Sequence, residues 1–164
     1  DAVGRGRRGV TASAPPGLFA AAGAQSGRPC RAASAVVSAF AAMRGQAADR
    51  SRSPAGTDQF RAPTRTIVFH GSADATVHPS NGEMIAAAVR NAGDHSTSEG
   101  RSAGGRTYTR SVAVDARGVP VLEHWTVDGA GHAWSGGSSA GSFTDPQGPE
   151  ASREMLRFFL AGSA

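Results

Sequence analysis

Short apolar runs bounded by glycine and polar residues recur along this chain and indicate strands. Leu18 to Gln25 is such a run, it ends at Ser26-Gly27, and it is typical of a buried parallel strand. Thr66 to His70 carries the strongest strand signal, because it is rich in β-branched and aromatic residues and is broken by Gly71.

A second pair of strands is predicted further along. Tyr108 to Val114 and Val121 to Val127 alternate between apolar and polar residues, and Asp115 to Gly118 between them is typical of a hairpin turn. Residues 94–106 and the polar segment 45–63 show no such alternation, and we expect surface connections there.

Helical spacing of apolar residues predicts three helices. The first helix is predicted at Ala32 to Arg44, which is rich in alanine. The second begins at Ser80, where Ser80 and Glu83 have the spacing of a capping box, and ends near residues 91–93. Gly148-Pro149-Glu150 begins the last helix, with proline at its first position and acidic residues in its first turn. The core face of that last helix is formed by Met155, Leu156, Phe159 and Leu160.

The order strand, helix, strand, helix, hairpin, helix predicts an α/β fold with an open, mostly parallel sheet flanked by helices. In such sheets, the chemistry collects at the carboxyl ends of the strands. Residues that directly follow a strand are therefore the first candidates for a site.

Composition sets the size and class of the protein. The chain has 164 residues, enough for one domain with a modest core, and 39% of them are hydrophobic. No stretch reaches the roughly 20 apolar residues of a membrane helix, and the N-terminal region lacks the apolar core of a signal peptide. The single cysteine, Cys30, cannot form an internal disulfide.

The positive charge of the chain comes from arginine alone. All 17 basic residues are arginine, and the sequence pI is about 10.9. These arginines are spread along the chain, apart from a short cluster at Arg5, Arg7 and Arg8. Biased codon usage explains this better than a phosphate-binding face, so we do not expect a nucleic-acid partner, although an arginine-rich nucleic-acid binder stays the weaker alternative.

Two residues that follow strands have side chains suited to acid–base chemistry. His132 lies in the glycine-rich run Gly129 to Trp134, after the strand that ends at Val127, and Asp74 follows the strand around Val68. An imidazole can take a proton from a hydroxyl, and a carboxylate on its other ring nitrogen fixes the tautomer. Alternatively, His132 has a structural role and Asp74 caps its own turn. Because both residues follow the ends of predicted strands, the catalytic interpretation gains weight.

Two long motifs resemble the poly(3-hydroxybutyrate) depolymerase family of esterases, which is related to feruloyl and acetylxylan esterases. They are His70 to Asn81 and Gly129 to Gly137, and the segments Leu18 to Gly27 and Gly141 to Pro149 are also similar. The resemblance covers roughly residues 18–160, the C-terminal half of a typical member. It implies an α/β-hydrolase fold over 18–164, with residues 1–17 irregular and unlike the family.

The resemblance also implies roles for the residues. Asp74 matches the acid of a catalytic triad and His132 its base, and no metal or organic cofactor would be needed. The substrate would be a small ester, a polyester or a polysaccharide ester, with no membrane partner, and the location would be extracellular. For Trp134 two interpretations stay open, one in which it lines the substrate cleft and one in which it packs beneath the histidine loop.

The family's serine nucleophile, in a Gly-x-Ser-x-Gly turn before the Leu18 strand, has no counterpart here. Ser13 lacks the flanking glycines, and Ser139 fits the pattern but lies in a Gly/Ser-rich loop, where the strand-to-helix turn that exposes a nucleophile is not expected. We therefore expect an inactive, truncated serine esterase, with residues 1–17 a possible product of a frameshift.

Two further expectations concern binding. A non-catalytic α/β module that binds polymer or carbohydrate around Trp134 is the main alternative to an esterase. His70, Asp74 and His78 recur at four-residue intervals, but Gly71 and Pro79 argue against one helix that presents all three, so no metal site is expected.

Overall fold

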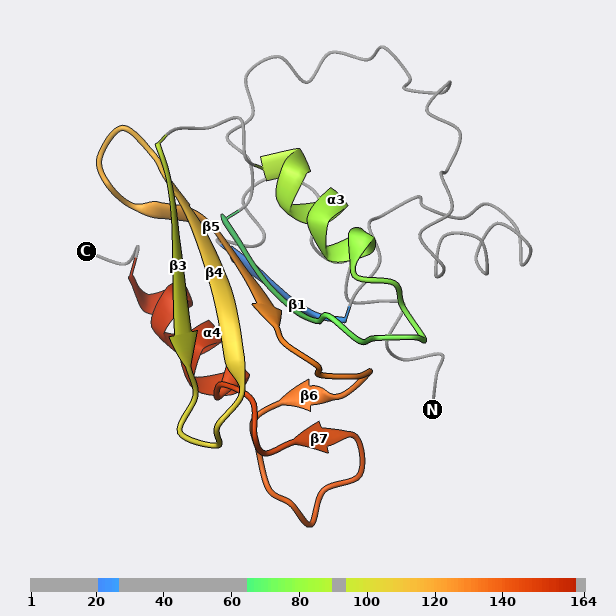
Figure 1. Cartoon of the computed structure of the whole chain (residues 1–164). Coiled ribbons are helices and arrows are strands. Elements are labelled where there is room, and N and C mark those ends of the chain that lie inside the picture. Colours follow the sequence, from blue (N-terminus) through green and yellow to red (C-terminus); the bar gives the residue numbers. More distant parts are fainter. Residues whose placement is uncertain (1–20, 27–64, 90–93, 162–164) are drawn as a thin grey trace, which may run out of the picture.

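A computed structural model of the chain describes residues 21–26, 65–89 and 94–161 (Figure 1). Within these ranges the main feature is a five-stranded sheet of order β1-β2-β5-β4-β3, accompanied by two helices and a small two-stranded ribbon. The elements are β1 (Ala21–Gln25), β2 (Arg65–Gly71), α3 (Ser80–Val89), β3 (His95–Arg101), β4 (Thr107–Val114), β5 (Pro120–Val127), β6 (Trp134–Ser135), β7 (Thr144–Asp145) and α4 (Ala151–Leu160).

The sheet is mixed, but four of its five strands run in one direction. β1 pairs with β2 and β2 with β5 in parallel, whereas β4 runs antiparallel to both β5 and β3. This arrangement confirms the predicted α/β class. It also brings the carboxyl ends of β1, β2 and β5 to one edge of the sheet.

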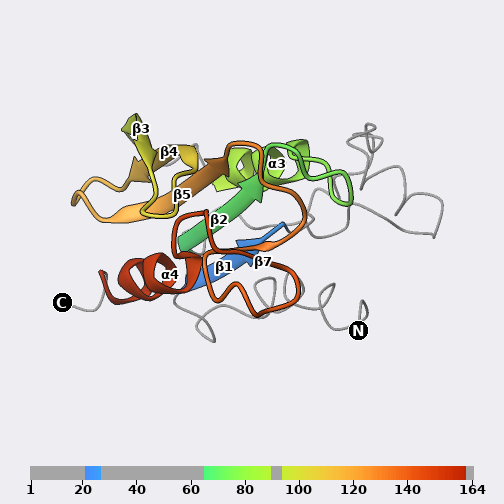
Figure 2. The same cartoon turned by 60° about the horizontal axis from the view of Figure 1, so that its bottom comes forward.

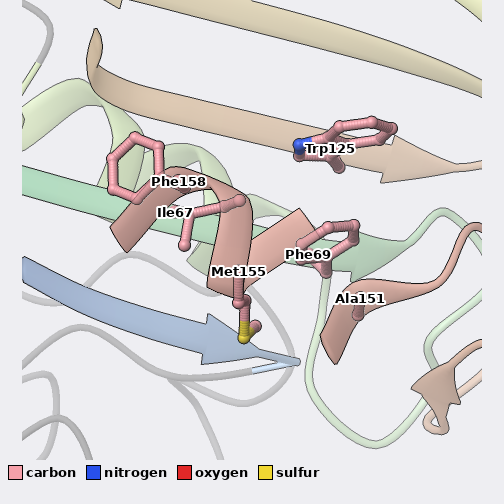
Figure 3. Close-up of a cluster of buried hydrophobic side chains, with 6 residues drawn as sticks. All are labelled: Ile67, Phe69, Trp125, Ala151, Met155 and Phe158. Carbon is pink, nitrogen blue, oxygen red and sulfur yellow. The ribbon is translucent and has the colours of Figure 1, made fainter. Parts of the chain in front are cut away.

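The two helices lie on opposite faces of the sheet (Figure 2). α4 packs on β2 and β5 through a buried cluster of Ile67, Phe69, Trp125, Ala151, Met155 and Phe158 (Figure 3). On the other face, Ala86 of α3 packs with Ala113, Val121 and Leu122. Because β2 is covered on both faces, its residues from Ile67 to Gly71 are all buried, as expected for a central parallel strand.

A buried carboxylate connects the hairpin to α4. Glu123 on β5 is fully buried, and both of its oxygens accept hydrogen bonds from Arg110 on β4, at 2.8 and 3.1 Å. Oε2 also accepts hydrogen bonds from Arg157 of α4 at 2.6 Å and from the indole of Trp125 at 3.1 Å. Such a fully paired carboxylate is stable inside a protein, and its pKa lies below the ordinary value because these bonds outweigh the effect of burial, which alone would raise it.

The structure corrects four details of the sequence interpretation. The core face of α4 consists of Ala151, Met155 and Phe158, whose spacing follows one side of the helix, whereas Leu156, Phe159 and Leu160 of the predicted face are exposed. Residues 95–101 form strand β3 rather than a loop, and were missed because the polar sequence His-Ser-Thr-Ser-Glu-Gly-Arg has no apolar alternation. α3 begins at Ser80, but the Glu83 backbone N–H donates to Pro79 O at 3.3 Å and the Ser80 backbone N–H to His78 Nδ1 at 3.3 Å, so the predicted capping box between Ser80 and Glu83 is wrong. α4 begins at Ala151, two residues after Pro149, with Glu150 as its N-cap.

Other predicted elements agree to within one residue or fall outside the described residues. The strand at Thr66 to His70 and the two strands of the hairpin are confirmed as β2, β4 and β5, and the part of the first strand from Ala21 onward is confirmed as β1. Residues 1–20, which include Ser13, and the predicted helix at 32–44 lie outside the described residues.

Candidate functional site

The candidate site is formed by the segments that leave the carboxyl ends of β2 and β5. These strands pair in parallel with Gly71 opposite Val127, so both chains leave the sheet side by side. Asp74 lies three residues after β2, and His132 lies five residues after β5. Topology therefore brings together two side chains that are 58 positions apart in the sequence.

Asp74 and His132 form a direct hydrogen bond. The distance from His132 Nδ1 to Asp74 Oδ2 is 2.9 Å. The other oxygen of Asp74, Oδ1, accepts the backbone N–H groups of Thr76 at 2.9 Å and Val77 at 2.8 Å. The two interpretations of Asp74 thus hold together, because one oxygen caps the local turn and the other orients the imidazole.

The Asp74 carboxylate is buried but remains ionised at neutral pH. Burial by itself would raise the pKa of Asp74. Hydrogen bonds from Val77, His132 and Ser26, together with the charge of His132, outweigh this effect and hold the pKa below its ordinary value. The negative charge is therefore available to stabilise an imidazolium at His132.

The two loops are held together by a close backbone approach. Ala73 N donates to Ala130 O at 3.0 Å, and Gly129 N donates to Ser72 Oγ at 2.9 Å. Gly129 has a φ of +63°, a conformation that favours glycine, and it turns the chain sharply after β5. This turn aims His132 back toward Asp74.

The tautomer of His132 follows from its partner. An ionised carboxylate can only accept a hydrogen bond, so Nδ1 of His132 carries a proton, and in the neutral imidazole Nε2 is the nitrogen that can accept one. About a quarter of the side chain is exposed. Among the described residues no hydroxyl or thiol group hydrogen-bonds Nε2, and Ser139 lies in an exposed turn between β6 and β7.

His70 is a second histidine close to Asp74. The sequence pattern predicted a structural or surface role for it. It is fully buried at the end of β2, its Nε2 donates to Val77 O at 2.7 Å, and the same nitrogen lies 3.5 Å from Asp74 Oδ2. Burial lowers the pKa of His70, although Val77 and Asp74 act in the opposite direction, and this shift favours the neutral ring. His78 is exposed and faces Ser80, and the described residues contain no group of three His, Cys, Asp or Glu side chains that could hold a metal ion.

Trp134 lies at the start of β6, two residues after His132. Its side chain is half-buried, packs against the core cluster beneath α4, and donates from Nε1 to Ser152 Oγ at 3.2 Å. These contacts favour the packing interpretation, and a contact with substrate stays a prediction. Two hollows in the described surface lie at the β3–β4 turn and beside the start of α4, and neither is lined by His132 or Asp74.

Two residues of the site were missed from the sequence. Gln25 and Ser26, at the end of β1, contact the His132 loop and Asp74 respectively. Their only signal was position, because Ser26 directly follows a predicted strand as Asp74 and His132 do. A glutamine and a serine in such a place are otherwise ordinary.

Fold and site together define an α/β protein with an aspartate–histidine pair at the carboxyl edge of its parallel strands. No protein-family model matches the chain. It is 30% identical to the poly(3-hydroxyalkanoate) depolymerase C of Paucimonas lemoignei over 131 residues, which cover 75% of this chain and 31% of the relative. The chain thus spans about a third of the length of this relative, and neither of its described helices is long and apolar enough to cross a bilayer.

Proposed function

We propose that the chain belongs to a serine-type carboxylic ester hydrolase of the poly(3-hydroxyalkanoate) depolymerase kind, in which His132 is the general base and Asp74 its orienting acid. The observation that carries the proposal is the 2.9 Å hydrogen bond between His132 Nδ1 and Asp74 Oδ2, made at the carboxyl edge of parallel strands. The similarity to the depolymerase supports the choice of reaction. The substrates would be small esters, polyesters or polysaccharide esters, met outside the cell.

The proposed chemistry follows from the state of each group. His132 Nε2 accepts the proton of a serine hydroxyl as that oxygen attacks the ester carbonyl carbon, and Asp74 stabilises the imidazolium that results. The imidazolium then returns the proton to the leaving alcohol as the acyl–serine ester forms. Water repeats the same sequence to release the acid and restore the serine.

The serine itself would come from outside the described residues, since none of the described hydroxyl groups hydrogen-bonds His132. Acyl transfer also needs donors for the oxyanion of the tetrahedral intermediate, and these would accompany the serine. For the 164-residue chain alone we expect hydrolysis of p-nitrophenyl butyrate at the buffer background. A rate above that background that disappears in His132→Ala would show that the chain contains its own nucleophile.

The decisive experiment uses the protein made from the whole reading frame that encodes this chain. We expect it to hydrolyse p-nitrophenyl butyrate, and we expect His132→Ala and Asp74→Asn to lower kcat by about 10³- to 10⁴-fold. His95→Ala is the matched control, because His95 is exposed on β3, and it should leave kcat unchanged.

Two outcomes would overturn the proposal. One is a folded protein that cleaves none of a set of short-chain p-nitrophenyl esters, and the other is hydrolysis that survives His132→Ala. Retention on insoluble poly(3-hydroxybutyrate) without cleavage would favour a polymer-binding module instead. Binding to DNA that weakens steeply with salt would favour a nucleic-acid binder.

A further inference from the structure

The end of β1 places two polar side chains beside the His132–Asp74 pair, and the proposed mechanism gives neither a role. The buried side chain of Ser26 lies beside the Asp74 carboxylate and lowers the pKa of that group. Gln25 Nε2 donates to Ala133 O at 3.0 Å, and Gln25 Oε1 lies 3.5 Å from the backbone N–H of Ser135. A short segment of one strand thus contacts both the acid and the loop that carries the base.

The backbone at Ser26 has a conformation that costs free energy. Its φ is +46°, in the left-handed region that residues with a Cβ rarely adopt. Ser26 N donates to Phe69 O at 2.9 Å, which continues the β1–β2 pairing by one residue, and the side chain is buried. Strained residues of this kind persist where the surrounding structure holds them, and they are concentrated at functional sites.

The direction of each hydrogen bond follows from the groups. The Ser26 oxygen accepts from Gln25 Nε2 at 3.5 Å. An ionised carboxylate only accepts, so Ser26 stabilises the Asp74 charge by directing its hydroxyl hydrogen toward the carboxylate. Gln25 thus contacts Ser26, and Ser26 influences Asp74, the hydrogen-bond partner of His132. The same Gln25 amide holds the carbonyl of Ala133, the residue after His132.

We propose that Gln25 and Ser26 are positioning residues for the acid–base pair. In this arrangement Ser26 fixes the Asp74 carboxylate, and Gln25 fixes the loop that carries the imidazole. The assignment rests on the proposed ester hydrolysis for its catalytic consequence, but the positioning itself can be measured without it.

The electrostatics of Asp74 agree with this assignment. Burial raises the pKa of Asp74, and the hydrogen bond from Ser26 is one of the contacts that bring it below the ordinary value. A carboxylate held in this way keeps its charge and its direction toward His132 Nδ1. Loss of either contact would misplace the base relative to the nucleophile, which lowers kcat more than it raises KM.

Three variants of the protein from the whole reading frame separate the effects. Ser26→Ala removes the hydroxyl and keeps the backbone strain, whereas Ser26→Gly removes the hydroxyl and relieves the strain. Gln25→Met keeps the approximate shape of the side chain without its hydrogen bonds. Ser96→Ala, which removes an exposed hydroxyl on β3, is the control.

The readouts are kcat and KM for p-nitrophenyl butyrate, thermal unfolding, and the low-field NMR signal of the His132 Nδ1 proton, identified by its loss in Asp74→Asn. We expect all three variants to lower kcat by about 10- to 100-fold, with KM changed by less than about twofold. We also expect the Nδ1 proton to exchange at least about tenfold faster with water. Ser26→Gly should melt no lower than Ser26→Ala and yet be equally impaired.

The results distinguish this assignment from the proposed function. Variants with the kcat and Nδ1 exchange of the parent protein would overturn the positioning roles and leave the esterase proposal intact. A kcat loss that only follows a loss of folded protein, absent in Ser26→Gly, would also overturn them. A parent protein without esterase activity whose Nδ1 signal is weakened by the variants would support the positioning roles and overturn the esterase.

Discussion

At the scale of single residues, the Asp74–His132 pair depends on how closely the two loops approach each other. A Cβ built on Gly71 would lie 2.2 Å from Ala130 O, a distance that no side chain can occupy, whereas a Cβ on Gly131 would meet nothing within 4 Å. We predict that Gly71→Ala lowers the free energy of unfolding by about 2 kcal/mol, because backbone must move to relieve the contact.

The matched variant Gly131→Ala should change the free energy of unfolding by less than about 0.5 kcal/mol. Urea unfolding followed by circular dichroism measures both values. Equal stability of the two variants would contradict the close approach of the loops. In the protein made from the whole reading frame, Gly71→Ala should also reduce the proposed ester hydrolysis, because the displaced loop carries Ala130 and His132.

The buried histidine of the site makes stability depend on pH. Burial lowers the pKa of His70 in the folded protein from its ordinary value of 6.5, so below that pH the unfolded chain binds a proton that the folded chain does not. The free energy of unfolding should therefore be fully retained above pH 6.5 and decrease as the pH falls, by at most about 1.4 kcal/mol per pH unit.

Urea unfolding between pH 5 and pH 7.5 tests this dependence. His70→Gln should flatten the profile, and His95→Gln, at an exposed position on β3, should preserve it. If the slope were the same in both variants, another group would have to be its source.

At the scale of elements, sequence patterns predicted the buried strands better than the exposed one. β2 was found to within one residue because its β-branched and aromatic residues are those of a strand covered on both faces. β3 was missed because all seven of its residues are polar or glycine, and its backbone hydrogen bonds to β4 hold it in place instead.

The candidate site divides in the same way. Asp74 and His132 could be paired from the sequence because each follows a strand and each has a side chain with known acid–base chemistry. The contacts of Gln25 and Ser26 could not be predicted from the sequence, because they depend on the parallel register in which Gln25 lies opposite Phe69. That register is set by tertiary packing, which a single sequence does not display.

The Glu123 network is an interaction between elements, and it carries its own prediction. Glu123→Gln keeps the shape of the side chain but removes the charge that Arg110 and Arg157 share. We expect the free energy of unfolding to fall by about 2 kcal/mol, the typical contribution of hydrogen bonds to a charged group. Glu99→Gln on the exposed strand β3 should have almost no effect, and an equal loss in both variants would contradict the structural role of Glu123.

At the scale of the whole molecule, the two edges of the described sheet differ in character. β3 forms one edge and presents exposed polar and charged side chains, which discourage pairing with another strand. β1 forms the other edge with the sequence Ala-Ala-Gly-Ala-Gln. A Cβ on Gly23 would touch Met155 and Phe159, so this edge adjoins α4, where Leu156 and Leu160 are exposed. Within the described residues, apolar surface and unpaired strand backbone thus occur together.

We predict that the 164-residue chain associates through the β1 edge as its concentration rises, because among the described residues no strand pairs with the outer side of β1, and unpaired backbone beside apolar surface favours strand addition. Ala22→Lys should suppress this association, because it places a charge on the β1 edge. Side chains alternate along a strand, so the lysine would point away from the face on which Gly23 contacts α4, and that contact would stay intact. Ser96→Lys adds the same charge to the opposite edge and should leave the association unchanged. Sedimentation velocity over a tenfold range of concentration measures the effect, and a chain that stays monomeric throughout would show that the β1 edge is protected.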